Sequence, residues 1–161
     1  MEGGYGQQTV PISRLWRQLP VEQVSWDDIH EFIGKLNDLK QHTGKPYRLP
    51  TGKEWEAACR AGAQQEYCGS NDADAVAWYD KNSGNSIHPV GQKDPNAWGL
   101  YDMSGNVWEW TQDCREGDCD RRNLQGGSWA GAPQGLRSAN GVKIAPTPGF
   151  DWFGFRLAQD L

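Results

Sequence analysis

Three oxygen-bearing side chains surround a glycine turn near the middle of the chain. Asp102, Asn106 and Glu109 lie close to Gly105 in the sequence, and several backbone carbonyls of this loop are expected to face the same pocket. Hard oxygen ligands of this kind suit Ca²⁺ better than zinc or iron. The same residue types also commonly satisfy backbone N–H groups in tight turns. The spacing therefore leaves two interpretations open, a structural calcium site and a purely hydrogen-bonded loop.

Aromatic residues gather near the C-terminus. Phe150, Trp152 and Phe153 stand beside the flexible Gly149 and two prolines. Aromatic side chains exposed on a loop supply the anchors of many protein interfaces. The alternative is that some of them fill the core next to Phe155. We expect Phe153 and Phe155 to point inward, and Phe150 and Trp152 to lie on the surface.

The cysteines form two pairs that are close in sequence, Cys59 with Cys68 and Cys114 with Cys119. Each pair could close a disulfide in an oxidising compartment, or remain as free thiols in a reducing one. Neither pair has zinc-like spacing with a nearby histidine. No nucleophile motif, phosphate-binding glycine loop or matched acid and base pair is evident either. The residue pattern itself thus indicates no catalytic chemistry.

A first helix that would position these residues is predicted over residues 26–41. Ser25 and Asp28 have the spacing of a capping box at its start, and residues 21–24 before it look like a short strand. One face of the helix is apolar at helical spacing, and it carries Ile29, Phe32, Ile33, Leu36 and Leu39.

A second, shorter helix begins where Thr51 and Glu54 repeat the capping box, and it should run to about Arg60 with Trp55 pointing inward. Beyond it, glycine, asparagine, aspartate and proline interrupt short apolar runs, which is typical of a loop-dominated β region. Trp108 and Trp110 lie two positions apart in a strand-like run, so at least one should lie in the core.

Composition agrees with one loop-rich α+β domain. The 161 residues include 20 glycines and nine tryptophans, while only 37 % are hydrophobic. A net charge of −5 provides no electrostatic attraction to nucleic acid or to an anionic membrane, and no apolar run is long enough to span a bilayer. The first residues lack the pattern of a signal peptide. We therefore expect a chain that is cytoplasmic as written, or displayed on a cell or phage surface by other means.

Four segments, in order, resemble the signature of the formylglycine-generating enzyme (sulfatase-modifying factor) family. They are residues 47–56 (YRLPTGKEWE), 96–110 (NAWGLYDMSGNVWEW), 125–129 (QGGSW) and 154–158 (GFRLA). The resemblance implies a C-type lectin fold of the formylglycine-generating-enzyme type over residues 20–161, loop-rich, with two helices packed on small antiparallel sheets. Residues 1–19 would form an extended arm. Because complete members have more chain before this domain, we expect a homo-oligomer or a partner chain at the N-terminal edge.

The resemblance also implies a metal site. In the family, the loop matching residues 96–110 binds calcium through the position of Asp102 and through carbonyls at the positions of Met103, Gly105 and Val107. It therefore implies a structural calcium ion here.

Catalytic members bind copper through a cysteine pair in the segment after Ser128, whereas no cysteine follows Cys119 in this chain. The related sulfoxide synthases bind iron through a histidine cluster, but the three histidines, His30, His42 and His88, stand apart. We expect no enzyme activity and neither copper nor iron. The alternatives are an oxygen-dependent formylglycine-generating or sulfoxide-synthase-like enzyme, and an accessory structural subunit.

The C-terminal segment, residues 130–153, resembles the variable proteins of diversity-generating retroelements, which display mutable residues on a fixed C-type lectin scaffold. The matching hypervariable, ligand-binding positions are Ala130, Gly131, Ala132, Gly135, Val142, Lys143, Ile144, Thr147, Phe150, Asp151 and Trp152. Their partner would be a protein or a cell-surface ligand. The framework residues Trp129, Leu136, Phe155 and Leu157 should be buried.

Overall fold

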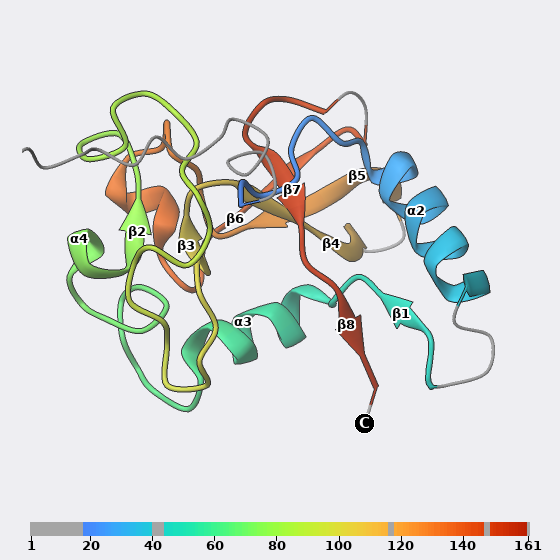
Figure 1. The fold of residues 1–161 in the computed structure, drawn as a ribbon, viewed down its shortest axis with the longest axis horizontal. Helices are drawn as coiled ribbons and strands as arrows, with labels where there is room; N and C mark the ends of the chain where they lie inside the picture. Colours follow the sequence, from blue (N-terminus) through green and yellow to red (C-terminus); the bar gives the residue numbers. More distant parts are fainter. Residues whose placement is uncertain (1–17, 40–43, 116–117, 147–148, 161) are drawn as a thin grey trace, which may run out of the picture.

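The computed structural model describes residues 18–39, 44–115, 118–146 and 149–160 (Figure 1). Most of the predicted arm over residues 1–19 lies outside the described residues, as does Thr147. The described helices are α2 (Trp26–Leu39), α3 (Gly52–Arg60), α4 (Ala73–Val76) and a short 3₁₀ helix, η1 (Pro133–Leu136). The described strands are β1 (Tyr47–Arg48), β2 (Ala77–Trp78), β3 (Ser104–Gly105), β4 (Trp108–Arg115), β5 (Asp118–Gln125), β6 (Gly141–Ile144), β7 (Phe153–Phe155) and β8 (Ala158–Gln159).

The centre of the fold is a four-stranded sheet in the order β6-β5-β4-β7. In Figure 1, α2 lies to one side of this sheet and α3 below it, while long loops surround β2 and β3 on the other side. Two further sheets have two strands each, β1 with β8 and β2 with β3. The predicted α+β class with small sheets is confirmed. Antiparallel pairing holds for β4–β5, β5–β6 and β1–β8, whereas β2–β3 and β4–β7 are parallel.

Local capping chemistry sets the start of α2. The Ser25 hydroxyl accepts a hydrogen bond from the Asp28 N–H at 3.1 Å, and the Asp28 carboxylate accepts from the Ser25 N–H at 2.9 Å. Ile29 and Ile33 are buried, as predicted. Phe32 and Leu39 are exposed, so the apolar face is narrower than its sequence pattern indicated. Phe32 lies at the flank of the helix and meets the ring of Phe155 edge-on.

The predicted strand over residues 21–24 is wrong. Gln23 adopts a left-handed backbone conformation with φ 58°, which interrupts an extended segment. Its N–H donates to the Phe150 carbonyl at 3.2 Å, so the segment lies against the C-terminal part of the chain. The approach to β7 is close enough that a Cβ at position 154 would lie 2.4 Å from the Val21 carbonyl oxygen. This contact explains the glycine at position 154.

Helix α3 follows the prediction closely. Thr51 and Glu54 form a reciprocal capping box, and Trp55 is buried. Hydrogen bonds from Arg48 and from the Thr51 N–H lower the pKa of Glu54 to about 2. The helix ends at Ala61, which takes the left-handed conformation with φ 46°.

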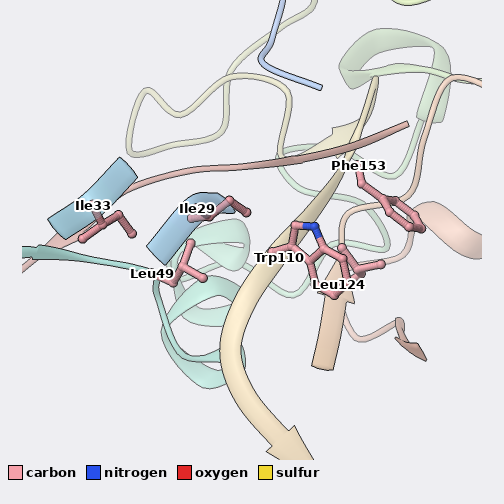
Figure 2. Close-up of a cluster of buried hydrophobic side chains, with 6 residues drawn as sticks. All are labelled: Ile29, Ile33, Leu49, Trp110, Leu124 and Phe153. Carbon is pink, nitrogen blue, oxygen red and sulfur yellow. The ribbon is translucent and has the colours of Figure 1, made fainter. Parts of the chain in front are cut away.

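The main core lies between α2 and the central sheet, and Figure 2 shows its six buried side chains, Ile29, Ile33, Leu49, Trp110, Leu124 and Phe153. Trp110 is fully buried, and its indole N–H donates to the Val24 carbonyl at 3.1 Å, which satisfies its polar atom. Trp108 is half-buried. The prediction that at least one of these two tryptophans is core is confirmed.

The structure resolves the alternatives for the cysteines, because Cys59 is bonded to Cys68 and Cys114 to Cys119. The first bond fastens the end of α3 to the loop that precedes α4. No helix in the described parts of the chain is both long and apolar enough to cross a membrane.

Candidate functional site

Three of the four sequence motifs meet at one largely buried ion pair, and the fourth packs against Trp55 beside it. Arg156 donates from Nε and Nη2 to the two carboxylate oxygens of Glu109, each at 2.6 Å. The Trp55 indole N–H donates to Glu109 Oε2, also at 2.6 Å. Gly126 packs beneath the Trp55 ring, where a Cβ would lie 3.2 Å from the ring. The motifs are therefore joined by a polar network that holds the scaffold together.

The electrostatics of this network favour the charged pair. Burial disfavours the Arg156 cation, but the charge and hydrogen bonds of Glu109 outweigh burial, so the pKa of Arg156 is raised. Arg156 Nη2 also donates to the Tyr101 carbonyl at 3.2 Å. Glu109 thus has both oxygens engaged, and its carboxylate serves the scaffold.

The loop from Asp102 to Glu109 is shaped by hydrogen bonds. The Asn106 side chain accepts from the His88 N–H at 3.1 Å and donates to the His88 carbonyl at 3.0 Å. Gly105 has φ 78°, and a Cβ there would lie 2.3 Å from the Trp78 carbonyl oxygen. For Asn106 and Glu109, the hydrogen-bonded interpretation of the loop describes what is observed.

Asp102 is the loop carboxylate that is still available to a ligand. Its Oδ2 accepts from the Gly91 N–H at 2.7 Å, which is the one hydrogen bond to this carboxylate among the described residues. It lines a cavity of about 370 Å³ together with Asn106 and Val107. Burial raises the pKa of Asp102, with the Gly91 hydrogen bond opposing that shift. A half-buried carboxylate with one oxygen free of hydrogen bonds fits a hard cation such as Ca²⁺.

The other implied calcium positions are buried. Met103, Gly105 and Val107 all lie inside the loop, and the Met103 carbonyl oxygen is 3.1 Å from Cys68 Sγ. Sequence reasoning missed His88 and Gly91, which hold Asn106 and Asp102 through their backbones. Backbone contacts of this kind leave no signal in residue type.

The predicted ligand-binding residues occupy three places. Ala130 and Ala132 are exposed and Gly131 and Gly135 are half-buried around η1. Val142 and Lys143 are exposed on β6, where Ile144 is half-buried. Phe150 and Asp151 are exposed just before β7, beside the half-buried Trp152.

Strand alternation sends the side chains of β6 to opposite faces of the sheet. Ile144 packs on the core cluster beside α2, and Val142 pairs with the buried Leu124 on that face. Lys143 pairs with Asn123 and lines a separate polar pocket near α3. The structure therefore places Val142 and Ile144 on the sheet face that carries the core cluster, and Lys143 on the opposite face.

Three aromatic side chains, Trp129, Phe150 and Trp152, form what we call the aromatic surface. The rings of Phe150 and Trp152 are stacked at 5.4 Å with an interplanar angle of 5°. Trp129 meets Trp152 edge-on at 6.2 Å. Beneath them, Phe153 is buried in the core, as predicted.

Only some of the predicted framework residues are buried. Leu136 is fully buried, as predicted, whereas Trp129 and Phe155 are half-buried. The prediction for Leu157 is wrong, because its side chain is 37 % exposed. Leu157 lies past the end of β7 and borders an apolar groove with Phe32 and Phe155.

Comparisons with known proteins place this geometry in context. A family model described as Sulfatase-modifying factor enzyme 1-like domain matches residues 5–161. The chaperone protein LppX of Paenibacillus barcinonensis is 37 % identical over 139 residues, which are 71 % of this chain and 48 % of that protein. The Inactive C-alpha-formylglycine-generating enzyme 2 of Bos taurus is 33 % identical over 183 residues, with 93 % and 58 % of the two chains covered. This chain thus spans about half the length of these relatives.

Among solved structures, the Treponema denticola variable protein 1 superposes with a TM-score of 0.80 at 28 % sequence identity. The superposition covers 96 % of this chain and 76 % of the other. The similarity therefore extends over the sheet, both longer helices and the C-terminal segment.

Proposed function

This chain belongs to the sulfatase-modifying factor enzyme 1-like domain family, and from that premise we propose that it is a non-catalytic ligand-binding domain. Its binding segment is residues 130–153, and its partner is a protein or a cell-surface ligand. One scaffold can carry both catalysts and binding domains, so the assignment depends on the site and not on the fold.

The observation that carries the proposal is the aromatic surface. Phe150 is 45 % exposed, yet its ring is held by stacking on Trp152 and by an edge contact with Phe153. The Gln23 N–H fixes the Phe150 carbonyl from outside the segment. An exposed ring that is already ordered loses little entropy on binding, which favours its use as an interface anchor.

A diversified surface is consistent with the exposure of this segment. Ala130, Val142, Phe150 and Asp151 all face solvent, so their replacement leaves the core intact. Similarity to a protein named variable protein 1 supports the same function. We therefore extend the proposal to a variable protein of a diversity-generating retroelement, in which these positions change while the framework stays fixed.

The cysteine arrangement argues against the enzymatic alternative. The segment after Ser128 contains no cysteine, and all four cysteines are engaged in disulfides. A Cu(I) site needs soft thiolate ligands, which the side chains of alanine, glycine, proline and leucine in that segment cannot replace.

We expect no aldehyde product when the protein is incubated with a sulfatase-type cysteine peptide, oxygen and copper, because no thiolate is available at the position that the chemistry needs. Mass spectrometry of the peptide measures the outcome, with an active formylglycine-generating enzyme as the positive control. Conversion of the cysteine to formylglycine would overturn the non-catalytic function.

We also propose a structural calcium ion at Asp102, held with the carbonyls of the loop at Met103, Gly105 and Val107. The free Asp102 oxygen and the cavity beside it support this site. A bound divalent cation would add its positive charge to that of Arg156, which lines the same cavity.

Calcium at 100 times its dissociation constant should stabilise the metal-free protein by about 2.7 kcal/mol and raise its Tm. Asp102→Asn should remove the response while it keeps an acceptor for the Gly91 N–H, and Asp151→Asn, an exposed control, should retain it.

Burial raises the pKa of Asp102, so this carboxyl stabilises the metal-free fold only while it is protonated, and that part of the free energy of unfolding is lost as pH rises through its pKa. The increase in Tm caused by calcium should instead become smaller as pH falls, because the protonated carboxyl binds calcium poorly. A Tm that calcium leaves unchanged at neutral pH would leave the loop stabilised by hydrogen bonds alone.

A further inference from the structure

A second pocket lies at the N-terminus of α3 and shares only Lys143 with the proposed binding segment. It has a volume of about 260 Å³ and is lined chiefly by polar side chains, among them Asp113, Asn123 and Gln125. Lys143 reaches it from the sheet face opposite Val142 and Ile144. The volume is slightly below the range of about 300–1,000 Å³ typical of drug-sized ligands, so any ligand must be small.

An unpaired acceptor lies at the bottom of this pocket. Gln125 is only 5 % exposed, and none of the described residues donates a hydrogen bond to its Oε1. Buried polar atoms nearly always have a partner, so an orphan that lines a pocket points to a donor supplied by a ligand.

Gly52 keeps this space open. A Cβ at position 52 would lie 2.8 Å from Asp113 Oδ2 and 3.1 Å from Gln125 Oε1. Any other residue at position 52 would therefore fill the pocket. The backbone N–H of Gly52 already donates to Asp113 Oδ2, so this N–H is not available to an anion.

The charges of the pocket are arranged in two layers. The inner part presents two acceptors, the Asp113 carboxylate and Gln125 Oε1, beside one donor, the amide nitrogen of Asn123. The rim carries the exposed lysines Lys53 and Lys143. Glu56, also at the rim, is paired with Arg60 at 2.7 Å. A simple cation would meet the lysines, and a simple anion would meet the acceptors of the inner part.

We propose that this pocket binds a small zwitterion of the amino acid class. Its ammonium group donates to Gln125 Oε1 and Asp113, and its carboxylate lies between Lys53 and Lys143. A metal ion is a poorer fit, because Lys53 and Lys143 stand at the rim and Glu56 is already paired with Arg60. The proposal is independent of the aromatic surface and of its protein ligand.

The test is an NMR titration of the full chain with each of the proteinogenic amino acids, and with ethylammonium and acetate as single-charge probes. We expect at least one amino acid to give saturable shifts at the Gly52 amide and at the Gln125 side-chain amide. Ethylammonium and acetate should each bind at least about tenfold more weakly, since each makes only half of the charge contacts. If no amino acid saturates, or if a single-charge probe binds as tightly, the zwitterion site is refuted.

Substitutions of the pocket residues test whether the amino acid binds in this pocket. Gly52→Ala should abolish the shifts by filling the space, whereas Gly34→Ala, where a Cβ meets nothing within 4 Å, should leave them unchanged. Gln125→Leu and Lys143→Met should each weaken binding about tenfold, and Lys45→Met serves as an exposed control. If Gly52→Ala does not fold, Gln125→Leu and Lys143→Met still test the proposal. Unchanged affinity in both would contradict the proposal.

Discussion

Replacing Arg156 with methionine is expected to lower the free energy of unfolding by about 3–5 kcal/mol, because it leaves the Glu109 carboxylate buried without its partner. Glu109 is almost fully buried, and its two oxygens accept from Arg156 at 2.6 Å. Denaturant unfolding followed by tryptophan fluorescence measures the loss. The effect should be large because three of the four sequence motifs contact this pair.

Two controls separate the buried pair from ordinary surface charge. Arg48→Met removes a more exposed pair with Glu54 and Asp160 and should cost only about 0–1 kcal/mol. Adding Glu109→Gln to Arg156→Met should recover part of the loss, because glutamine is neutral and still accepts from the Trp55 indole. A loss for Arg156→Met no greater than that for Arg48→Met would contradict the role given to this network.

Folding and binding are expected to separate within the C-terminal segment. Leu136→Ala should cost about 2–5 kcal/mol, since the side chain is fully buried and its removal leaves a cavity. Asp151→Ala, at an exposed position, should change stability by less than about 0.5 kcal/mol. Phe150→Ala should cost about 1 kcal/mol, because it loses its aromatic contacts but little burial. Thermal melts of the three variants measure these differences.

Trp152 is intermediate between these cases. Its half-buried side chain packs against the core cluster as well as against Phe150. Trp152→Ala should therefore destabilise more than Phe150→Ala does. Equal losses for Leu136→Ala and Phe150→Ala would mean that the segment is core and not a binding surface.

Features of the fold that depend on neighbouring residues could be predicted from the sequence. The capping boxes at Ser25 and Thr51 each involve a partner three residues away, and both are present in the structure. The inward direction of Trp55 also follows from helical spacing. Helix α4, with four residues, is too short for any period to appear.

Features that depend on distant contacts could not be predicted. Residues 21–24 have the composition of a strand, but Gln23 is turned by its contact with the Phe150 carbonyl. Leu157 has the type of a core residue, yet no element covers it among the described parts of the chain, and it borders a groove. Tertiary packing overrides local propensity in both cases.

Only part of the candidate site could be predicted, because the rest also depends on contacts between distant residues. Alternation along β6 indicates that Val142 and Lys143 point in opposite directions, but not which face each takes. That choice follows from the pairing of β6 with β5, where Val142 meets Leu124 and Lys143 meets Asn123. Glu109 was predicted as a loop oxygen for calcium, and its pairing with Arg156 depends on a residue 47 positions away.

The proposed binding surface is tested most directly by a displayed library in which Ala130, Val142, Phe150 and Asp151 are randomised on the unchanged framework and selected against immobilised lysozyme. A matched library randomises four exposed positions elsewhere, Gln64, Lys81, Gln92 and Ala97. We expect the first library to yield lysozyme binders whose Tm stays within a few degrees, about 5 °C, of the parent, and the second to yield none. Binders that arise equally from both libraries, or a first library whose members bind nothing or fail to fold, would contradict a ligand-binding function for this segment.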